Sequence, residues 1–269
     1  MVKKKVSVFL LSCLASCLLT GCAAAPDEET DKMIESDIQS ELTEEKENLL
    51  SKISMDEQRV RDGELYGWQV EVLRQYDAAL EYMYEKYPSH QFEIVDCSPQ
   101  NVWNDYTIFY CQADGQDDLQ EMYITKNDDG SYTCADTYYG HLIRDEYSNL
   151  LLDLLKAEAP ECIAVDAQIT GRLGEEYRES MPAESFLEGL KRGDKVSNFV
   201  TIYAVCRTED EAQKTLSNVK TFIQDEGIYG GYTLYALKQD PGIQDGIDEW
   251  INEQGESVYW IKENFQQFG

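Results

Sequence analysis

The chain of 269 residues holds few side chains of the types that carry out covalent chemistry. It has eight cysteines but only two histidines. A nucleophilic cysteine needs a base beside it, and the pairs seven residues apart are His90 with Cys97 and Cys134 with His141. No family signature surrounds either pair, and no C-x-x-C motif indicates a redox dithiol or a zinc ribbon. A Cys–His enzyme therefore stays an alternative rather than the main hypothesis.

Carboxylates are abundant, with 52 Asp and Glu residues, so neighbouring pairs of acids carry little information. The run 127–130 (Asn-Asp-Asp-Gly) offers oxygens of the kind that Ca²⁺ binds, but it lacks the ligand ladder and closing Glu of a calcium-binding loop. A hairpin turn is the favoured interpretation. No glycine-rich phosphate-binding motif occurs either. We expect no metal site and no cofactor. A hydrolase that uses two carboxylates remains an alternative, because their separation depends on the fold.

Tyrosine is the unusual residue of this chain, with 18 copies. Tyrosine combines a large rigid ring with a polar tip and is enriched at binding surfaces. Two clusters with neighbouring glycines are candidates for a binding face: Tyr138 and Tyr139 with His141, and Tyr229 with Tyr232. The alternative is a tyrosine-rich sheet core whose edges reach water.

The N-terminus carries an export signal. Three lysines, Lys3 to Lys5, precede a mostly apolar stretch of 14 residues, 6–19. That stretch is shorter than the roughly 20 residues that a membrane-spanning helix needs. It ends in Leu19-Thr20-Gly21-Cys22, which resembles the lipobox of bacterial lipoproteins: an aliphatic residue, two small residues and a cysteine.

This resemblance implies a lipid anchor. Residues 1–21 would be removed as a lipoprotein signal peptide, and Cys22 would carry a diacylglyceryl group on the extracytoplasmic face of the cell membrane. Two acyl chains are enough for stable attachment, whereas one is not. An ordinary cleaved signal or an anchor helix is the alternative. Both one- and two-membrane bacteria use this signal, so the type of envelope stays open.

The segment 22–61 is expected to be an acidic tether behind the anchor. Ten acids lie between Asp27 and Glu47, against two lysines. Charged linkers of this kind repel themselves and extend. The whole chain has a formal charge of −29, and loss of the three signal lysines would make it −32. Such a body is repelled by anionic lipid and cannot easily bind nucleic acid. A short helix over residues 43–54 is the alternative for the end of the tether.

The rest of the chain predicts an α+β fold in two parts. Residues 62–159 should form a long helix, a four-stranded antiparallel meander and a second helix, because apolar spacings of three and four give way to period-two alternation. The expected helices are 64–87 and 142–158, and the expected strands are 91–97, 106–112, 120–126 and 132–138. In element order this part resembles the cystatin-like α+β rolls of exported bacterial proteins, without signature residues.

Residues 160–269 should form a second lobe in which strands and helices alternate. The expected strands are 163–170, 199–206, 232–238 and 257–262, and the expected helices are 182–191, 208–226 and 243–252. Five cysteines remain beyond the lipobox, an odd number, so at least one thiol is unpaired: Cys97, Cys111, Cys134, Cys162 and Cys206.

Together these features predict a lipid-anchored, extracytoplasmic binding or assembly protein of the bacterial cell envelope that is not a catalyst. We expect contact with the membrane through Cys22, an envelope protein as partner, and no nucleic acid. The alternatives are an envelope hydrolase and a lipoprotein that binds a small solute or a cation. The body of about 210 residues is short for the two-lobed binding proteins of the periplasm.

Overall fold

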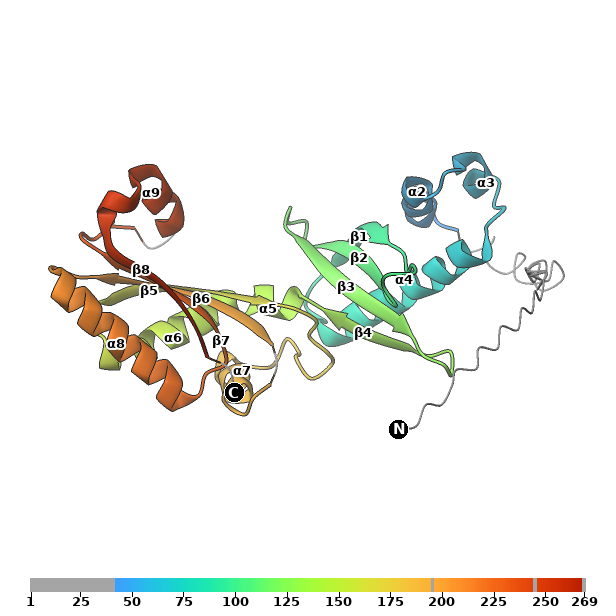
Figure 1. Cartoon of the computed structure of the whole chain (residues 1–269). Coiled ribbons are helices and arrows are strands. Elements are labelled where there is room, and N and C mark those ends of the chain that lie inside the picture. Colours follow the sequence, from blue (N-terminus) through green and yellow to red (C-terminus); the bar gives the residue numbers. More distant parts are fainter. Residues whose placement is uncertain (1–41, 195, 244–245, 268–269) are drawn as a thin grey trace, which may run out of the picture. The chain divides into compact units, whose positions relative to one another are not determined.

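The computed structural model describes residues 42–194, 196–243 and 246–267 (Figure 1). Over these residues the chain is mixed α+β, with eight α-helices and two four-stranded sheets, as the sequence predicts. The lipobox, Cys22 and the first half of the expected tether lie outside the described residues. None of the described helices has the combination of length and apolar composition that crossing a bilayer requires. By their contacts, residues 42–269 belong to one compact unit.

The folded body begins inside the segment expected to be tether, with helices α2 (Glu44–Ile53) and α3 (Glu57–Arg61). Thr43 caps α2 by accepting a hydrogen bond from the backbone N–H of Lys46, so the alternative of a helix over residues 43–54 is confirmed. Leu50 and Val60 are fully buried, and the Lys46 ammonium lies 2.8 Å from Asp77. Residues 44–61 are therefore packed structure rather than a solvated linker.

The first sheet is the predicted meander, with strands in sequence order β1-β2-β3-β4, all antiparallel. Its elements are α4 (Gly67–Lys86), β1 (Phe92–Ser98), β2 (Thr107–Ala113), β3 (Leu119–Lys126) and β4 (Tyr132–Asp136). Helix α4 packs on one face over buried Phe109, Met122 and Ile124. Gly130, at a φ of +85°, makes the β3–β4 turn that the sequence predicts.

The second sheet follows two helices, and its strands lie in the order β5-β6-β7-β8. The remaining elements are α5 (Tyr138–Leu142), α6 (Arg144–Glu158), β5 (Cys162–Thr170), α7 (Ala183–Lys191), β6 (Ser197–Val205), α8 (Glu209–Glu226), β7 (Gly230–Leu237), α9 (Ile247–Gln254) and β8 (Tyr259–Gln267). The second helix predicted at 142–158 is α6, and a short helix that was not predicted, α5, precedes it. Strand β8 runs five residues beyond its predicted end at Lys262, because pairing with β7 holds its polar residues in the sheet.

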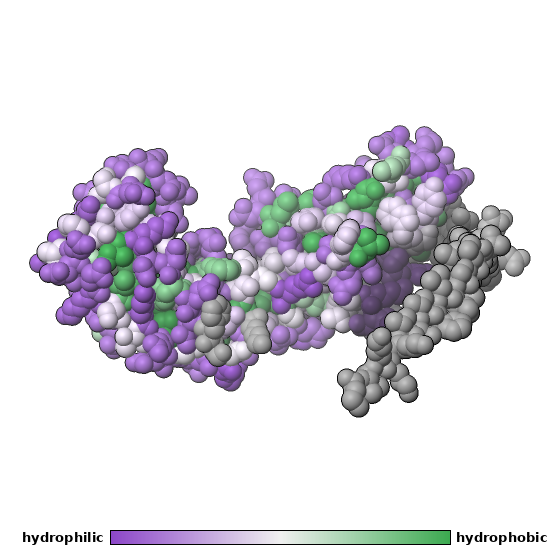
Figure 2. All heavy atoms as spheres, viewed as in Figure 1, coloured by the Kyte–Doolittle hydropathy of each residue, from purple (hydrophilic) through white to green (hydrophobic). Residues whose placement is uncertain are grey.

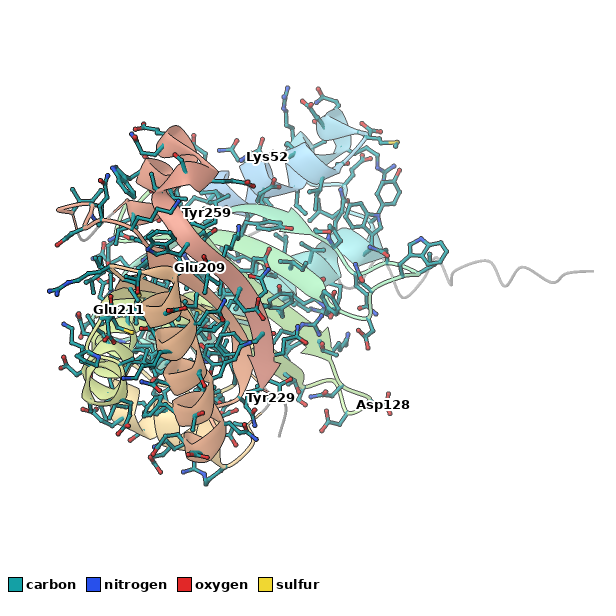
Figure 3. All side chains as sticks on the ribbon, turned by 60° about the vertical axis from the view of Figure 1, so that its left-hand side comes forward. Lys52, Asp128, Glu209, Glu211, Tyr229 and Tyr259 are labelled. Carbon is teal, nitrogen blue, oxygen red and sulfur yellow. The ribbon has the colours of Figure 1, made fainter. Side chains whose placement is uncertain are left out.

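Strands β6 and β7 are parallel, whereas the other two pairs in this sheet are antiparallel. Helix α8 makes the crossover between them. Half of the predicted capping box forms: the Glu211 N–H donates to Thr208 Oγ1 at 3.2 Å, but the Glu211 carboxylate (labelled in Figure 3) accepts from the Arg207 N–H at 2.6 Å instead of from that of Thr208. Helices α6 and α8 lie on one face of the sheet and α9 lies on the other (Figure 1).

A buried ion pair joins Lys86, at the end of α4, to Asp136, at the end of β4, and Lys86 also contacts the chain that follows β5. The Lys86 ammonium lies 2.5 Å from Asp136 Oδ2 and donates to the Leu173 carbonyl at 2.9 Å. The Tyr82 and Tyr87 hydroxyls donate to the same carboxylate at 2.9 and 2.8 Å. Burial lowers the pKa of Lys86, and the adjacent carboxylate opposes that shift. This cluster holds an amine and a carboxyl group away from water, so its geometry is critical for stability.

Candidate functional site

The first predicted tyrosine cluster lies around the two histidines. The buried Tyr138 ring stacks on His141 at 5.9 Å between centroids, and its hydroxyl lies 2.9 Å from His90 Nδ1. The same His90 nitrogen lies 2.6 Å from Asp114 Oδ2, and this hydrogen bond holds the pKa of Asp114 below its usual range. The structure therefore brings Tyr138 and His141 together with His90, which the sequence had considered only as a partner of Cys97.

This histidine cluster has a base but no nucleophile to activate. Among the described residues no hydrogen bond joins a histidine to a cysteine. The five described thiols are unpaired, and burial raises the pKa of Cys97 to about 12 and that of Cys134 to about 11. Both thiols of the suggested Cys–His pairs are therefore neutral at physiological pH, and the arrangement does not assemble the nucleophile that such an enzyme needs.

The remaining predicted tyrosines belong to the interior. Tyr139 is fully buried, and its hydroxyl donates to the Met181 carbonyl at 3.1 Å. Tyr232 is 3% exposed and donates to the Ile228 carbonyl at 2.9 Å. Tyr229 is half-buried (labelled in Figure 3). The rings of Tyr139 and Tyr232 fill the core, so the two clusters do not form one exposed binding face.

A surface that the sequence analysis missed is the face of the second sheet turned away from α6 and α8, here called the open face. Strand register arranges its side chains in rows that each cross all four strands. Row one is Gln168, Phe199, Gly231 and Gln266. Row two is Asp166, Thr201, Thr233 and Asn264. Row three is Ala164, Tyr203, Tyr235 and Lys262.

Helix α9 covers row three and leaves rows one and two uncovered. The rings of Tyr203 and Tyr235 stack at 5.9 Å with an interplanar angle of 14°. They pack with Ile247 and Ile251 of α9 in one hydrophobic cluster. The Tyr203 hydroxyl also hydrogen-bonds Asp248, and burial followed by this carboxylate raises the pKa of Tyr203. The face is thus closed at one end and open at the other.

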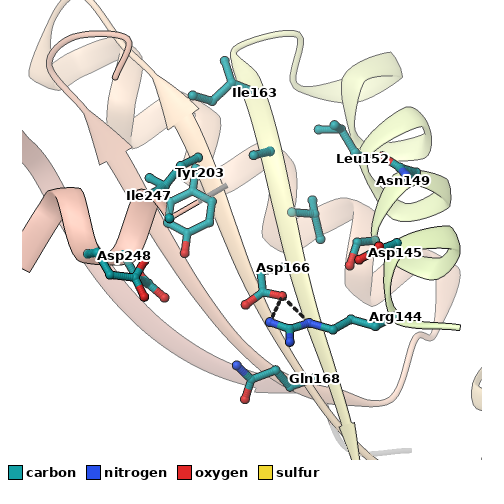
Figure 4. A pocket seen from close by; sticks show the side chains of 15 residues that line it. Arg144, Asp145, Asn149, Leu152, Ile163, Asp166, Gln168, Tyr203, Ile247 and Asp248 are labelled. Atoms are coloured by element: carbon teal, nitrogen blue, oxygen red, sulfur yellow. Dashed lines mark hydrogen bonds and ion pairs between the residues drawn. The ribbon is translucent and has the colours of Figure 1, made fainter. Parts of the chain in front are cut away.

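A cavity of about 540 Å³ lies at edge strand β5, between α9 on the open face and the N-terminal half of α6. Figure 4 shows Arg144 of α6 reaching across β5 to Asp166, where Nε and Nη2 donate to the same carboxylate oxygen at 2.9 and 2.6 Å. Tyr203 and Asp248 lie on the opposite side of β5 in this view (Figure 4). The cavity wall is therefore mostly polar, with one aromatic ring.

A second hollow of about 480 Å³ lies over rows one and two on strands β6, β7 and β8, and it shares β6 with the first. Phe199 is 55% exposed there, and its ring lies over Gly231, where a Cβ atom would come within 3.1 Å of Phe199 Cδ1. Thr233 Oγ1 donates to Asn264 Oδ1 at 2.8 Å. Among the residues that the structure describes, no charged side chain lines this hollow. The open face thus combines one exposed ring with neutral hydroxyl and amide groups.

In the first sheet, the β1–β2 connection presents a different kind of surface, here called the hairpin tip and consisting of Val102 and Trp103. These side chains are 91% and 89% exposed. The tip is fixed by backbone hydrogen bonds in both directions between Asn101 and Asn104, and Asn101 Oδ1 accepts from the Trp103 N–H at 2.9 Å. The tip is an ordered turn that holds two apolar side chains in water.

The described part of the chain contains no group of three or more His, Cys, Asp or Glu side chains arranged to hold a metal ion. No protein-family model, curated protein or solved structure matches the chain. The surfaces that a functional argument can use are therefore a polar cavity, a neutral sheet face and an apolar hairpin tip.

Proposed function

We propose that this chain is a lipid-anchored, extracytoplasmic binding protein of the bacterial cell envelope and not a catalyst. The observation that supports binding is the open face, where a 540 Å³ cavity adjoins a hollow lined by neutral polar groups. The Leu19-Thr20-Gly21-Cys22 sequence, after a basic and apolar leader, supports the anchor and the location.

The anchor is tested by membrane fractionation with an alkaline wash. Cys22→Ala removes the thiol that would be lipidated, so we expect this variant to leave the membrane fraction. Cys17→Ala is the matched control, because that cysteine would be removed with the leader. Retention of Cys22→Ala protein in the washed membranes would show that the anchor hypothesis is wrong.

Binding on the open face is tested by ligand-dependent melting. The probes are neutral oligosaccharides, single amino acids, short peptides and Ca²⁺. We expect at least one of them to raise Tm, and Thr201→Arg to abolish the rise, because the long side chain would project into the hollow. Thr125→Arg is the control, since Thr125 is also a half-buried threonine on an interior strand but belongs to the first sheet. An equal loss in both variants would contradict the assigned surface.

Assembly with an envelope protein is a second candidate function, and the hairpin tip favours it. Exposed tryptophan on an ordered turn is the side chain most enriched at the centres of protein interfaces. Quantitative capture from solubilised envelopes would compare the wild type with Trp103→Ala. We expect one protein at near-equal amount to be lost in Trp103→Ala but kept in Trp68→Ala, which removes a half-exposed tryptophan of α4. Equal recovery with both variants would rule out the tip as the docking point.

A further inference from the structure

We infer that the open face binds a neutral, hydroxyl-rich chain, that is, a short stretch of an uncharged oligosaccharide. This inference rests on the proposed binding function and names the class of ligand. It follows from the charge of the face, from the hydrogen-bonding groups on it and from the exposed ring of Phe199.

The charge of the three rows disfavours anionic ligands. Among the twelve positions in the three rows, only Asp166 and Lys262 are charged. Asp166 is already paired with Arg144, and the Lys262 ammonium lies over the Tyr235 ring at 4.9 Å. The face therefore offers no free pair of cations to a phosphate or sulfate. The chain as a whole, at −29, repels polyanions.

This lack of charge is unusual for this molecule. Charged residues make up 28% of the sequence, and hydrophilic residues cover most of the surface seen in Figure 2. Rows one and two instead carry side-chain amides and hydroxyls at five positions: Gln168, Thr201, Thr233, Asn264 and Gln266. Each of these groups both donates and accepts hydrogen bonds. A sugar hydroxyl has the same dual capacity, so the two sets of groups match without ionic partners.

Phe199 supplies the apolar half of the recognition. Its ring lies over Gly231 on the neighbouring strand and remains 55% exposed. A pyranose ring has one face of C–H groups that packs on an aromatic ring while its hydroxyls point outward to polar neighbours. On the open face those neighbours are the amides of Gln168 and Gln266 in the same row, and Thr201 and Thr233 in the next.

The dimensions favour a chain of sugars over a single small solute. Neighbouring strands are about 4.8 Å apart, so a row across four strands extends about 14 Å. Row two joins the neutral hollow to the cavity, because Thr201 and Thr233 line the first and Asp166 lines the second. An oligosaccharide lying over rows one and two can therefore reach the polar groups of the cavity, whereas α9 prevents it from continuing over row three.

An extended peptide fits this surface less well. Peptides that join a sheet do so at an edge, where backbone groups are unpaired. The N–H of Ala167 on edge strand β5 already donates to Ser148 Oγ of α6 at 3.0 Å, so α6 occupies that position. The polar groups of the open face are side chains on both the central and the edge strands, rather than unpaired backbone groups of an edge.

The experiment is calorimetric titration of the full, folded chain with three neutral oligosaccharides: oligomers of α-linked glucose, of β-linked glucose and of N-acetylglucosamine. Dextran and dextran sulfate form a matched pair of probes that differ in charge. We expect at least one neutral oligosaccharide to bind, dextran sulfate not to bind, and Phe199→Ala to weaken binding at least tenfold. Asn264→Ala should weaken it at least threefold, and Tyr110→Ala, which removes an aromatic side chain from the first sheet, should leave it unchanged.

The outcomes separate the ligand class from the binding function. If a peptide or an ion binds with the same dependence on Phe199, the sugar assignment is wrong while the proposed function stands. If a neutral oligosaccharide binds equally well to Phe199→Ala and Asn264→Ala, the open face is not its site. If no probe of any class binds the folded wild type, both the inference and the proposed binding function are overturned. Melting curves of each variant, compared with the wild type, establish that the variants are folded.

Discussion

The two sheets share an architecture and differ in what their uncovered faces present. Each has four strands with one face packed under helices, and in the second sheet α9 also covers part of the other face. Across the uncovered face of the first sheet, register aligns Asp96, Tyr110 and Glu121. The corresponding middle row of the second sheet continues from Thr201 to Thr233 and Asn264. An acidic row is best solvated by water, whereas a neutral row can exchange water for another neutral polar partner.

The connections explain how the second face is built. Neighbouring strands of the first sheet are joined directly along the chain, so its faces are set by short-range alternation. In the second sheet α8 crosses from β6 to the parallel β7 and places Phe199 beside Gly231. The exposed ring and the glycine beneath it come from segments that are distant in sequence. The candidate site therefore depends on pairing between strands that are distant in sequence, whereas the first sheet forms without such pairing.

The strongest test breaks the ion pair that ties the first sheet to the chain after β5. Lys86→Met leaves the fully buried Asp136 without its counter-charge. We expect the free energy of unfolding to fall by about 3–5 kcal/mol, measured by urea denaturation. Lys46→Met is the control, because its partner Asp77 is half exposed, and it should cost less than about 1 kcal/mol. Equal losses in the two variants would mean that Lys86 does not compensate a buried charge.

Thiol reactivity tests whether both sheets bury their cysteines equally. Burial raises the pKa of Cys111 in the first sheet and Cys162 in the second to about 12. Against the ordinary value of 9, this reduces the thiolate fraction at pH 8 on the order of a thousandfold. We expect Cys111 and Cys162 to be alkylated only after unfolding. Cys134 should be alkylated before them, since it is partly exposed and its pKa is about 11. Peptide mapping after timed labelling measures this.

The same raised pKa values fix the direction of a pH effect on stability. A thiol whose pKa is higher in the folded state stabilises the fold fully below the unfolded pKa, and that contribution is lost as pH rises through the folded value. Stability should therefore decrease above about pH 9. Rapid native labelling of Cys111 or Cys162 would contradict both statements.

Two adjacent glycines of β7, Gly230 and Gly231, should differ in how much stability an added methyl group costs. A Cβ at Gly230 would lie 2.7 Å from the Asn198 backbone oxygen, which cannot move alone, so Gly230→Ala should cost about 1–3 kcal/mol. A Cβ at Gly231 would meet only the Phe199 ring, which can rotate, so Gly231→Ala should cost less than about 1 kcal/mol. Thermal denaturation of the two variants gives the order, and the reverse order would contradict the placement of the ring.

The smallest effect is expected from the ion pair at the cavity. Arg144 and Asp166 are partly exposed, so Arg144→Ala should change the free energy of unfolding by less than about 1 kcal/mol. The Lys126–Glu71 pair of the first sheet is a matched exposed pair, and Lys126→Ala should give a similarly small change. Both effects should shrink further at 1 M salt, as measured by urea denaturation. A large, salt-independent loss in Arg144→Ala alone would mean that the pair supports the fold rather than the cavity.

Most elements of the fold were predictable because their signals are local. The helix expected at 64–87 is α4, and the alternation of residues 106–112 is β2. Helix α5 was missed, since five residues are too few to show a helical spacing of apolar residues. The length of the tether was overestimated. The ten acids predicted a solvated linker, whereas Leu50 and Val60 are buried in the fold.

The site was much less predictable. Tyr232 lies in a strand that is apolar at nearly every position, so alternation could not tell which side faces the helices. Phe199 looks like any apolar residue of a buried strand, and its exposure is visible only once Gly231 is known to lie beside it. A lone aromatic residue paired across strands with a glycine is the signal to search for, but it requires knowledge of the register.

The hydrogen bonds to Asp136 also indicate the order in which the two sheets fold during synthesis. All five groups that donate to its carboxylate lie between residues 82 and 139: the Lys86 ammonium, the Tyr82 and Tyr87 hydroxyls and the Tyr138 and Tyr139 backbone N–H groups. They are present before any strand of the second sheet has been made. The parallel pair β6–β7 must wait for Leu237, and non-local pairing of this kind is slow. The first sheet should thus fold quickly, and the second should set the rate at which the native protein appears.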